Sequence, residues 1–214
     1  MSKALHFFSH AEKEKIKEAT SAAESKTIGE IAVMIVDSST RYREGETLGA
    51  ITLGNVLAFL ITVFFLHESL WWYIPLTLAF FILWWLVFQK IPSATLHFTG
   101  TKRRQLAVRD RAIRAFYEKG LHGTRGKTGM LFFISLLERK VWVLADKGIH
   151  EKISQAKLNT FAKNISNGIR NGDASGALIQ AIKEAGELLH QHFPIEDGDA
   201  NELPDTIIFG GEEQ

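Results

Sequence analysis

Two long stretches without a charged residue constrain this chain of 214 residues more than any other feature. They cover residues 47–66 and 69–88, and only His67 and Glu68 separate them. Each has about the ~20 residues that a helix needs to cross the hydrocarbon core of a bilayer. Helices of this length in a soluble core normally keep a polar face, and these stretches have almost none. Because so short a linker joins antiparallel neighbours, we predict an inserted transmembrane hairpin over residues 47–89.

The cations beside these stretches predict an orientation. They precede the first stretch and follow the second: Arg41, Arg43, Lys90, Lys102, Arg103 and Arg104. The linker between the stretches has no Lys or Arg. The positive-inside rule then places both termini in the cytoplasm. We therefore expect a multi-pass protein of the cell inner (plasma) membrane, with the lipid bilayer as its first partner.

A stripe of small residues, Ala50, Gly54 and Ala58, runs along the first apolar stretch. Small side chains let helix backbones approach closely. The stripe can pack against the second helix of the hairpin. Alternatively, it can mediate self-association or contact with another membrane protein.

Charge and composition exclude several other classes. The formal net charge is +1, but residues 102–127 hold nine Lys or Arg and two acids, whereas residues 195–214 hold seven acids and no Lys or Arg. The positive-inside rule is enough to explain a basic segment beside a membrane helix. We therefore predict no nucleic-acid partner. The chain has no Cys, which excludes disulfides and thiolate sites.

The remaining residues read as one α/β domain that is discontinuous, over residues 1–46 and 90–214. Ser9 and Glu12 form a capping-box pattern that opens an amphipathic helix. Further helices are predicted over 101–121, 148–170 and 174–192, and strands over 30–38, 129–137 and 140–146. Because the first strand must share a core with the later two, the hairpin is an insertion within this domain rather than a boundary between two.

Polar residues at the predicted strand ends suggest a candidate site. A turn at Glu138–Arg139 would pair Leu131 with Asp146 and bring Lys127 to the same sheet edge. If the first strand ran parallel to residues 140–146, Asp37 would also end there.

Carboxylate oxygens suit a hard cation, so Asp37 and Asp146 are the predicted metal ligands, with calcium as the first candidate. Arg125 and Lys127 are the predicted anion-binding residues. The alternative is that these are ordinary solvated residues of strand ends. No catalytic residue and no further cofactor is predicted.

Several pieces, taken in order, resemble the TPM domain family. They are FFSHAEKEKIKEAT, TIGEIAVMIVDSS, RAIRAFYEKGLHGTRGKTGMLFFISLLERKVWVLADKGIHEKI, GIRNGDASGALIQAIKEAGELLHQHFP and NELPDTIIFG. The resemblance implies a mixed β-sheet with helices on both faces. It also implies two activities described in the family, acid phosphatase in plant members and calcium binding. The hairpin departs from the common pattern, in which a shorter soluble segment follows the first strand.

Two classes of function follow. The first is a membrane-anchored TPM-domain protein that acts as a non-catalytic interaction or assembly module for membrane protein complexes. The alternative is a metal-dependent, calcium-linked phosphatase or hydrolase of the TPM type. Clustering of Asp37, Asp146 and Lys127 in one cleft would favour the second class.

Overall fold

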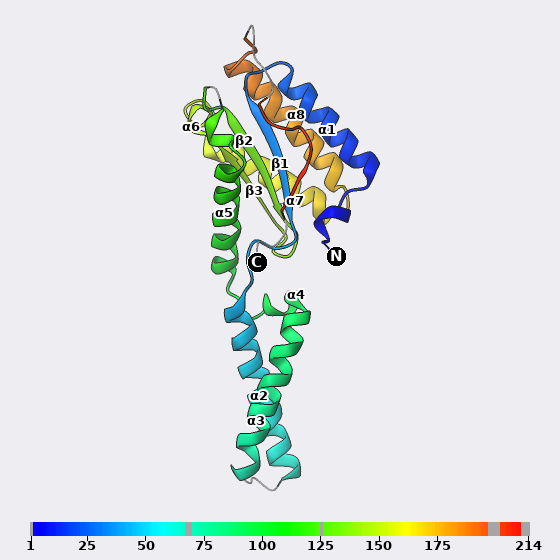
Figure 1. Cartoon of the computed structure of the whole chain (residues 1–214), viewed down its shortest axis with the longest axis vertical. Coiled ribbons are helices and arrows are strands. Elements are labelled where there is room, and N and C mark those ends of the chain that lie inside the picture. Colours follow the sequence, from blue (N-terminus) through cyan, green and yellow to red (C-terminus); the bar gives the residue numbers. More distant parts are fainter. Residues whose placement is uncertain (1, 67–69, 125, 197–201, 211–214) are drawn as a thin grey trace. The chain divides into compact units, whose positions relative to one another are not determined.

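The computed structural model describes residues 2–66, 70–124, 126–196 and 202–210. The chain forms two compact units (Figure 1). The α/β unit comprises Met1–Ser39 and Ala107–Gln214, and the hairpin unit comprises Thr40–Leu106. The hairpin unit extends beyond residues 47–89 because the short helix α4 (Pro92–Thr95) contacts both of the long apolar helices.

The α/β unit is built on a four-stranded mixed sheet. Its strands are β1 (Glu30–Val36), β2 (Gly129–Ser135), β3 (Lys140–Ala145) and β4 (Ile208–Gly210), in the order β3-β2-β1-β4. Strand β1 runs parallel to β2 and β4, whereas β2 and β3 are antiparallel. The predicted mixed sheet is confirmed. Strand β4 was not predicted, because three residues in an acidic tail carry too little periodicity.

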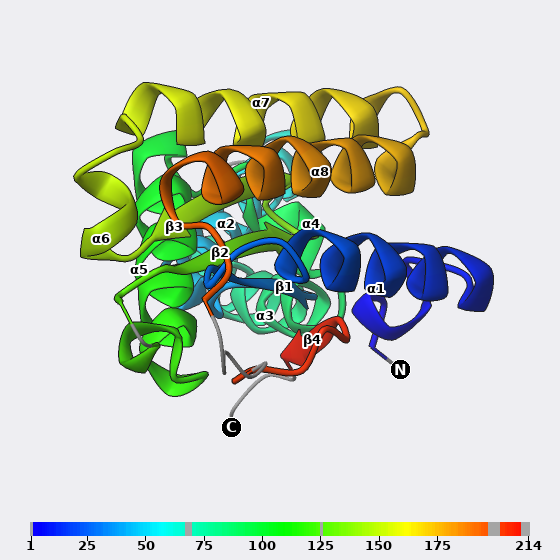
Figure 2. The ribbon, with the colours of Figure 1, turned by 90° about the horizontal axis from the view of Figure 1, so that it is seen from above.

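Helices cover both faces of this sheet, as expected. The longer ones are α1 (His10–Glu24), α5 (Thr101–Glu118), α7 (Gln155–Arg170) and α8 (Ala174–His192). Helix α8 lies between α1 and α7 and contacts both (Figure 2). These three pack on one face and α5 on the other. Short turns of helix occur at η1 (Ala4–His6), η2 (Leu121–Gly123) and α6 (Lys147–His150).

The apolar run of β1 is explained by this arrangement. Ile31, Val33 and Ile35 face the core under α1, α7 and α8. Ala32 and Met34 face the core under α5. Successive side chains of a strand point to opposite faces, so a strand covered on both sides is apolar at every position.

A local signal in the sequence places the start of helix α1 correctly. The Ser9 hydroxyl accepts a hydrogen bond from the Glu12 N–H, and the Glu12 carboxylate accepts one from the Ser9 N–H. The predicted capping box is therefore confirmed.

The pairing of β2 with β3 differs from the prediction by two residues. Leu131 pairs with Leu144, not with Asp146. After Ser135 the chain stays beside the end of β1, where the N–H of Leu136 donates to the carbonyl of Val36. The connection therefore takes four residues, and Arg139 adopts a positive φ of 52°. A shift of two residues leaves each side chain on the same face of the sheet, because side chains alternate with a period of two.

The hairpin unit contains two long apolar helices, α2 (Arg43–Phe65) and α3 (Leu70–Lys90). Both are long and apolar enough to cross a membrane, by length and composition. They pack against each other along their length. The predicted His67–Glu68 turn lies outside the described residues.

Candidate functional site

The two predicted metal ligands lie at opposite ends of the sheet. Asp37 follows the last residue of β1, and Asp146 follows the last residue of β3. Because β2 is parallel to β1 but antiparallel to β3, those two strand ends point in opposite directions. The sequence reasoning assumed that β1 runs parallel to β3, and this premise is wrong. Asp37 and Asp146 therefore do not share one cation.

Asp37 holds the N-terminal segment against the sheet. Its Oδ1 accepts a hydrogen bond from the Ala4 N–H at 2.5 Å. Beside it, the Ser39 hydroxyl donates to the Ser135 hydroxyl oxygen at 2.9 Å. Both the Ser39 N–H and the Ser135 hydroxyl donate to the carboxylate of Glu138. All three residues of this network are buried, so it closes the end of the sheet rather than exposing a reactive group.

Asp146 begins helix α6. Its Oδ1 accepts a hydrogen bond from the Lys147 N–H at 2.7 Å. The Gly148 N–H donates to the carbonyl of Lys127 at 3.1 Å, so Lys127 and Asp146 share one edge, as predicted. Lys127 is exposed and has a positive φ of 56°. Arg125 lies outside the described residues.

Within the described part of the chain, no group of three or more His, Asp or Glu side chains is placed to hold a metal ion. The predicted two-carboxylate site is thus divided into single aspartates that each have a structural partner. Calcium binding stays a prediction for which no site is located.

A cluster of carboxyl groups, missed by sequence reasoning, lies at the amino end of β1. Glu24 accepts a hydrogen bond from the Ile31 N–H at 2.7 Å and contacts the side chain of Asp205. Glu30 accepts a hydrogen bond from the Glu202 N–H at 3.0 Å. Burial raises the pKa of Glu24 to about 9, and the negative charges of Glu30 and Asp205 act in the same direction. The protonated Glu24 helps hold the C-terminal segment beside the sheet.

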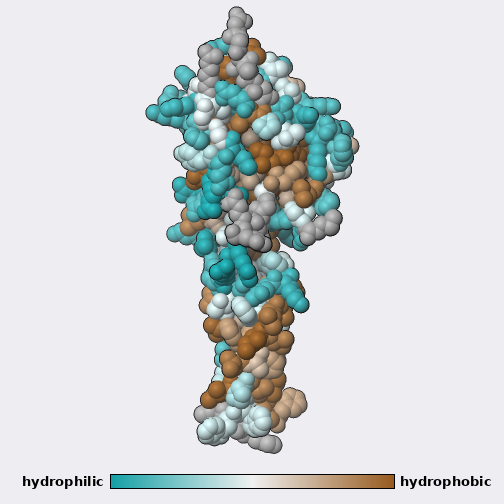
Figure 3. All heavy atoms as spheres, in the orientation of Figure 1, coloured by the Kyte–Doolittle hydropathy of each residue, from teal (hydrophilic) through white to brown (hydrophobic). Residues whose placement is uncertain are grey.

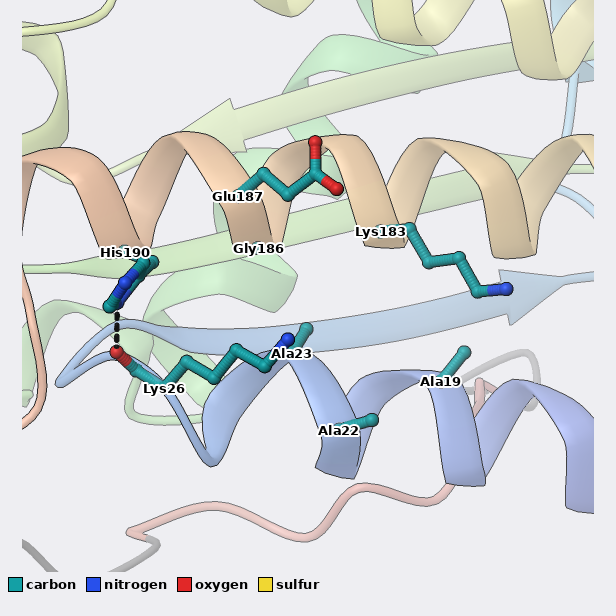
Figure 4. A pocket seen from close by; sticks show the side chains of 8 residues that line it. All are labelled: Ala19, Ala22, Ala23, Lys26, Lys183, Gly186, Glu187 and His190. Carbon is teal, nitrogen blue, oxygen red and sulfur yellow. Dashed lines mark hydrogen bonds between the residues drawn. The ribbon is translucent and has the colours of Figure 1, made fainter.

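A groove of ≈ 270 Å³ lies between α1 and α8 (Figure 4). It exists where the two helices approach closely, since a Cβ on Gly186 would lie 2.5 Å from the Cβ of Ala23. Lys26 and Lys183 extend along it, and His190 Nδ1 lies 2.6 Å from the carbonyl oxygen of Lys26. The full lining is Ala19, Ala22, Ala23, Lys26, Lys183, Gly186, Glu187 and His190. Its floor is alanine and glycine, which supply no reactive group.

The small-residue stripe faces the inside of the hairpin. Ala50 and Ala58 are fully buried, and a Cβ on Gly54 would lie 3.0 Å from the backbone nitrogen of Phe81. The Tyr73 hydroxyl also donates across the seam to Asn55 at 3.0 Å. Helix α3 therefore packs against the stripe, whereas self-association or contact with another membrane protein stays a prediction.

The outward faces of α2 and α3 are apolar and uncovered. Trp71 is 87% exposed, Phe65 76% and Phe64 73%. Figure 3 shows hydrophobic residues over much of the hairpin surface. Exposed apolar surface of this extent marks a contact with lipid or with another protein.

These features define a class: an α/β unit with a mixed sheet, interrupted in the chain by an apolar helical hairpin. The family model described as the TPM domain matches residues 95–188 of this chain. The match runs from α4 into α8 and includes β2 and β3. The recognition from the sequence is confirmed.

A solved structure has a similar fold. The NMR structure of BA42 protein from the psychrophilic bacterium Bizionia argentinensis has a TM-score of 0.60. The two chains are 20% identical, and the alignment covers 95% of this chain and 96% of that one. At this identity the likeness concerns the fold. No curated protein matches the chain.

Proposed function

We propose that the hairpin is embedded in a lipid bilayer and anchors the TPM domain there as a non-catalytic interaction or assembly module. The observation that carries the proposal is the exposure of the large apolar side chains of α2 and α3. In water, each such side chain would forfeit roughly 1.5–3 kcal/mol that burial supplies. A bilayer removes this cost along the whole hairpin.

The degree of burial separates this proposal from a soluble helical core. Only 28% of the apolar window of α2 and 6% of that of α3 are buried. A core helix of a soluble protein would have most of its window covered. Trp71 and Trp72 stand near one end of α3 and Trp84 and Trp85 near the other, which suits the two membrane–water interfaces.

Flanking charges support an orientation with both termini in the cytoplasm. Arg43 begins α2 and Lys90 ends α3. Arg103 forms an ion pair with Glu44, which brings the start of α5 to the same end of the hairpin. The linker at the other end has no cation. The cytoplasmic end of a hairpin carries the Lys and Arg excess.

The polar groups that could have formed a hydrolytic site already have structural hydrogen-bond partners, which favours the assembly role over hydrolysis. Asp37 and Asp146 each accept a backbone hydrogen bond and lie apart. The Ser39–Ser135–Glu138 network is buried. The partner that fits is another membrane protein, which would meet the anchored α/β unit at the cytoplasmic surface or the hairpin within the bilayer.

Our first prediction concerns topology. Because the chain has no Cys, Glu68→Cys and Gln214→Cys each introduce a single reactive thiol. In intact cells a membrane-impermeant maleimide should label the first variant and not the second. Both should react after the cells are lysed. Labelling of the second alone would contradict the orientation, and extraction of the chain by alkaline carbonate would contradict membrane insertion.

The assembly role is tested by capture of partners from detergent-solubilised membranes. The full chain should retain membrane proteins that a chain without residues 40–106 does not retain. Phosphate-ester hydrolysis that requires Asp37 or Asp146 would instead support the hydrolase alternative.

A further inference from the structure

The cytoplasmic end of the hairpin unit carries four cations that form no ion pair with any described residue. The acids in the described part of this unit, Glu44 and Glu46, are already paired with Arg103 and Arg41 at 2.9 and 3.0 Å. No described residue forms an ion pair with the remaining four. We call this group the cationic collar: Arg43, Lys90, Lys102 and Arg104.

Packing within the unit brings the collar together. A Cβ on Gly49 would lie 2.7 Å from the ring of Phe88 and 2.9 Å from that of Phe98. The rings of Phe88 and Phe98 meet edge to face, with centroids 5.6 Å apart. The first turns of α2, the last turn of α3 and the segment after α4 therefore form one end of the hairpin, and the Arg103–Glu44 pair adds the start of α5.

Two of these side chains have donor groups without an acceptor among the described residues. Arg104 donates through Nη2 to the Thr101 hydroxyl oxygen at 3.1 Å, but its Nε is buried and has no hydrogen-bond acceptor among the described residues. Lys90 is exposed at the end of α3, directly before Ile91, which is 49% exposed. A cation beside an exposed apolar residue matches the boundary between headgroups and acyl chains.

We propose that the cationic collar binds the phosphate of anionic phospholipid headgroups in the cytoplasmic leaflet. This rests on the proposed membrane insertion and goes beyond it, because insertion requires only acyl chains. Two guanidinium and two ammonium groups offer donors to phosphodiester oxygens and attract a headgroup of net negative charge. Glu44 and Glu46 already form ion pairs with Arg103 and Arg41, so these two acids do not neutralise the collar.

The test uses the full chain reconstituted in phosphatidylcholine vesicles. Trp84 and Trp85 lie about one and a half turns before Lys90, so lipids with brominated acyl chains near the collar quench their fluorescence. Quenching by brominated phosphatidylglycerol is compared with quenching by brominated phosphatidylcholine. We expect the anionic lipid to be preferred at least about five-fold, the factor equivalent to roughly 1 kcal/mol for one cation near a charged surface.

Matched variants locate the effect. Lys90→Gln with Lys102→Gln should bring the preference close to one, and Lys152→Gln with Lys163→Gln, which removes two exposed lysines of the α/β unit, should leave it unchanged. A wild-type preference of one would overturn the collar proposal while leaving insertion intact. Loss of the preference in millimolar inorganic phosphate at constant ionic strength would assign the site to soluble phosphate and overturn the lipid assignment. Absence of quenching by brominated phosphatidylcholine would instead overturn membrane insertion itself.

Discussion

At the scale of single residues, the buried carboxyl of Glu24 has a clear electrostatic consequence. Its carboxyl is held between the Ile31 N–H and the carboxyls of Glu30 and Asp205. Burial raises its pKa from 4.5 to about 9. Between these pH values the folded chain keeps a proton on Glu24 that the unfolded chain has released. The free energy of unfolding therefore decreases as the pH rises through this window.

Glu24→Gln should remove this pH dependence. Glutamine keeps an oxygen for the Ile31 N–H and mimics the protonated acid, so the variant should match the wild type near pH 5 and exceed it near pH 9. We expect a gain on the order of 1 kcal/mol, because partial exposure screens much of the shift. Thermal unfolding of the full chain in detergent, recorded across this pH range, measures it. Glu14→Gln, at an exposed position of the same helix, is the control and should change little. Equal pH dependence of the unfolding temperature in the wild type and both variants would contradict the raised pKa of Glu24.

At the scale of elements, the seam of the hairpin is set by side-chain size. Gly54 allows the backbones of α2 and α3 to approach at Phe81, and Ala50 and Ala58 continue the contact one turn to either side. In a bilayer such close packing replaces the hydrophobic effect as the force between helices.

Gly54→Leu should separate the helices, because its side chain would collide with the backbone of Phe81. Overpacking of this kind costs about 1–3 kcal/mol. The variant should denature at a lower temperature in detergent, as followed by tryptophan fluorescence. Val56→Leu adds bulk at an outward position that is 52% exposed and should leave the transition unchanged. A melting temperature of Gly54→Leu equal to that of the wild type would show that the seam does not limit stability.

At the scale of the whole molecule, both hydrophobic cores belong to the α/β unit. Every residue of the two core clusters lies in Met1–Ser39 or Ala107–Gln214. The hairpin unit contributes none of them. Residues 40–106, which lie between β1 and the core-facing part of α5, thus supply no residue to either core cluster.

A chain in which a short flexible linker replaces residues 40–106 should consequently fold as a soluble α/β protein. Loop-closure entropy changes only with the logarithm of loop length, so the replacement has a small cost. Circular dichroism and a dispersed proton NMR spectrum would report the fold. A chain that is soluble but lacks chemical-shift dispersion would show that the hairpin unit contributes to folding after all.

Local patterns in the sequence determined the helices, the apolar hairpin and the buried strand β1. The capping box at Ser9 and Glu12 and the charge-free runs act over distances of a few to about twenty residues, so they are visible without a fold. The burial of every residue of β1 likewise agrees with its apolar composition, because both faces of its sheet are covered.

Only the tertiary structure decided which polar groups meet. Asp37 and Asp146 separate because β2, rather than β3, lies beside β1. The Ser39–Ser135 contact joins positions 96 residues apart, and the Glu30–Glu202 contact joins positions 172 apart. Strand order and register are set over long range by the packing of the whole core. Because β3 runs antiparallel to β2 and β2 lies between β3 and β1, the residue after β3 lies at the opposite end of the sheet from the residue after β1. The sequence by itself therefore determined the longer helices, the three longer strands and the apolar hairpin. The short strand β4 and the break between α6 and α7 within the helix predicted over 148–170 depended on the tertiary structure. The carboxyl cluster, the packed small-residue stripe and the cationic collar likewise depended on how the elements pack.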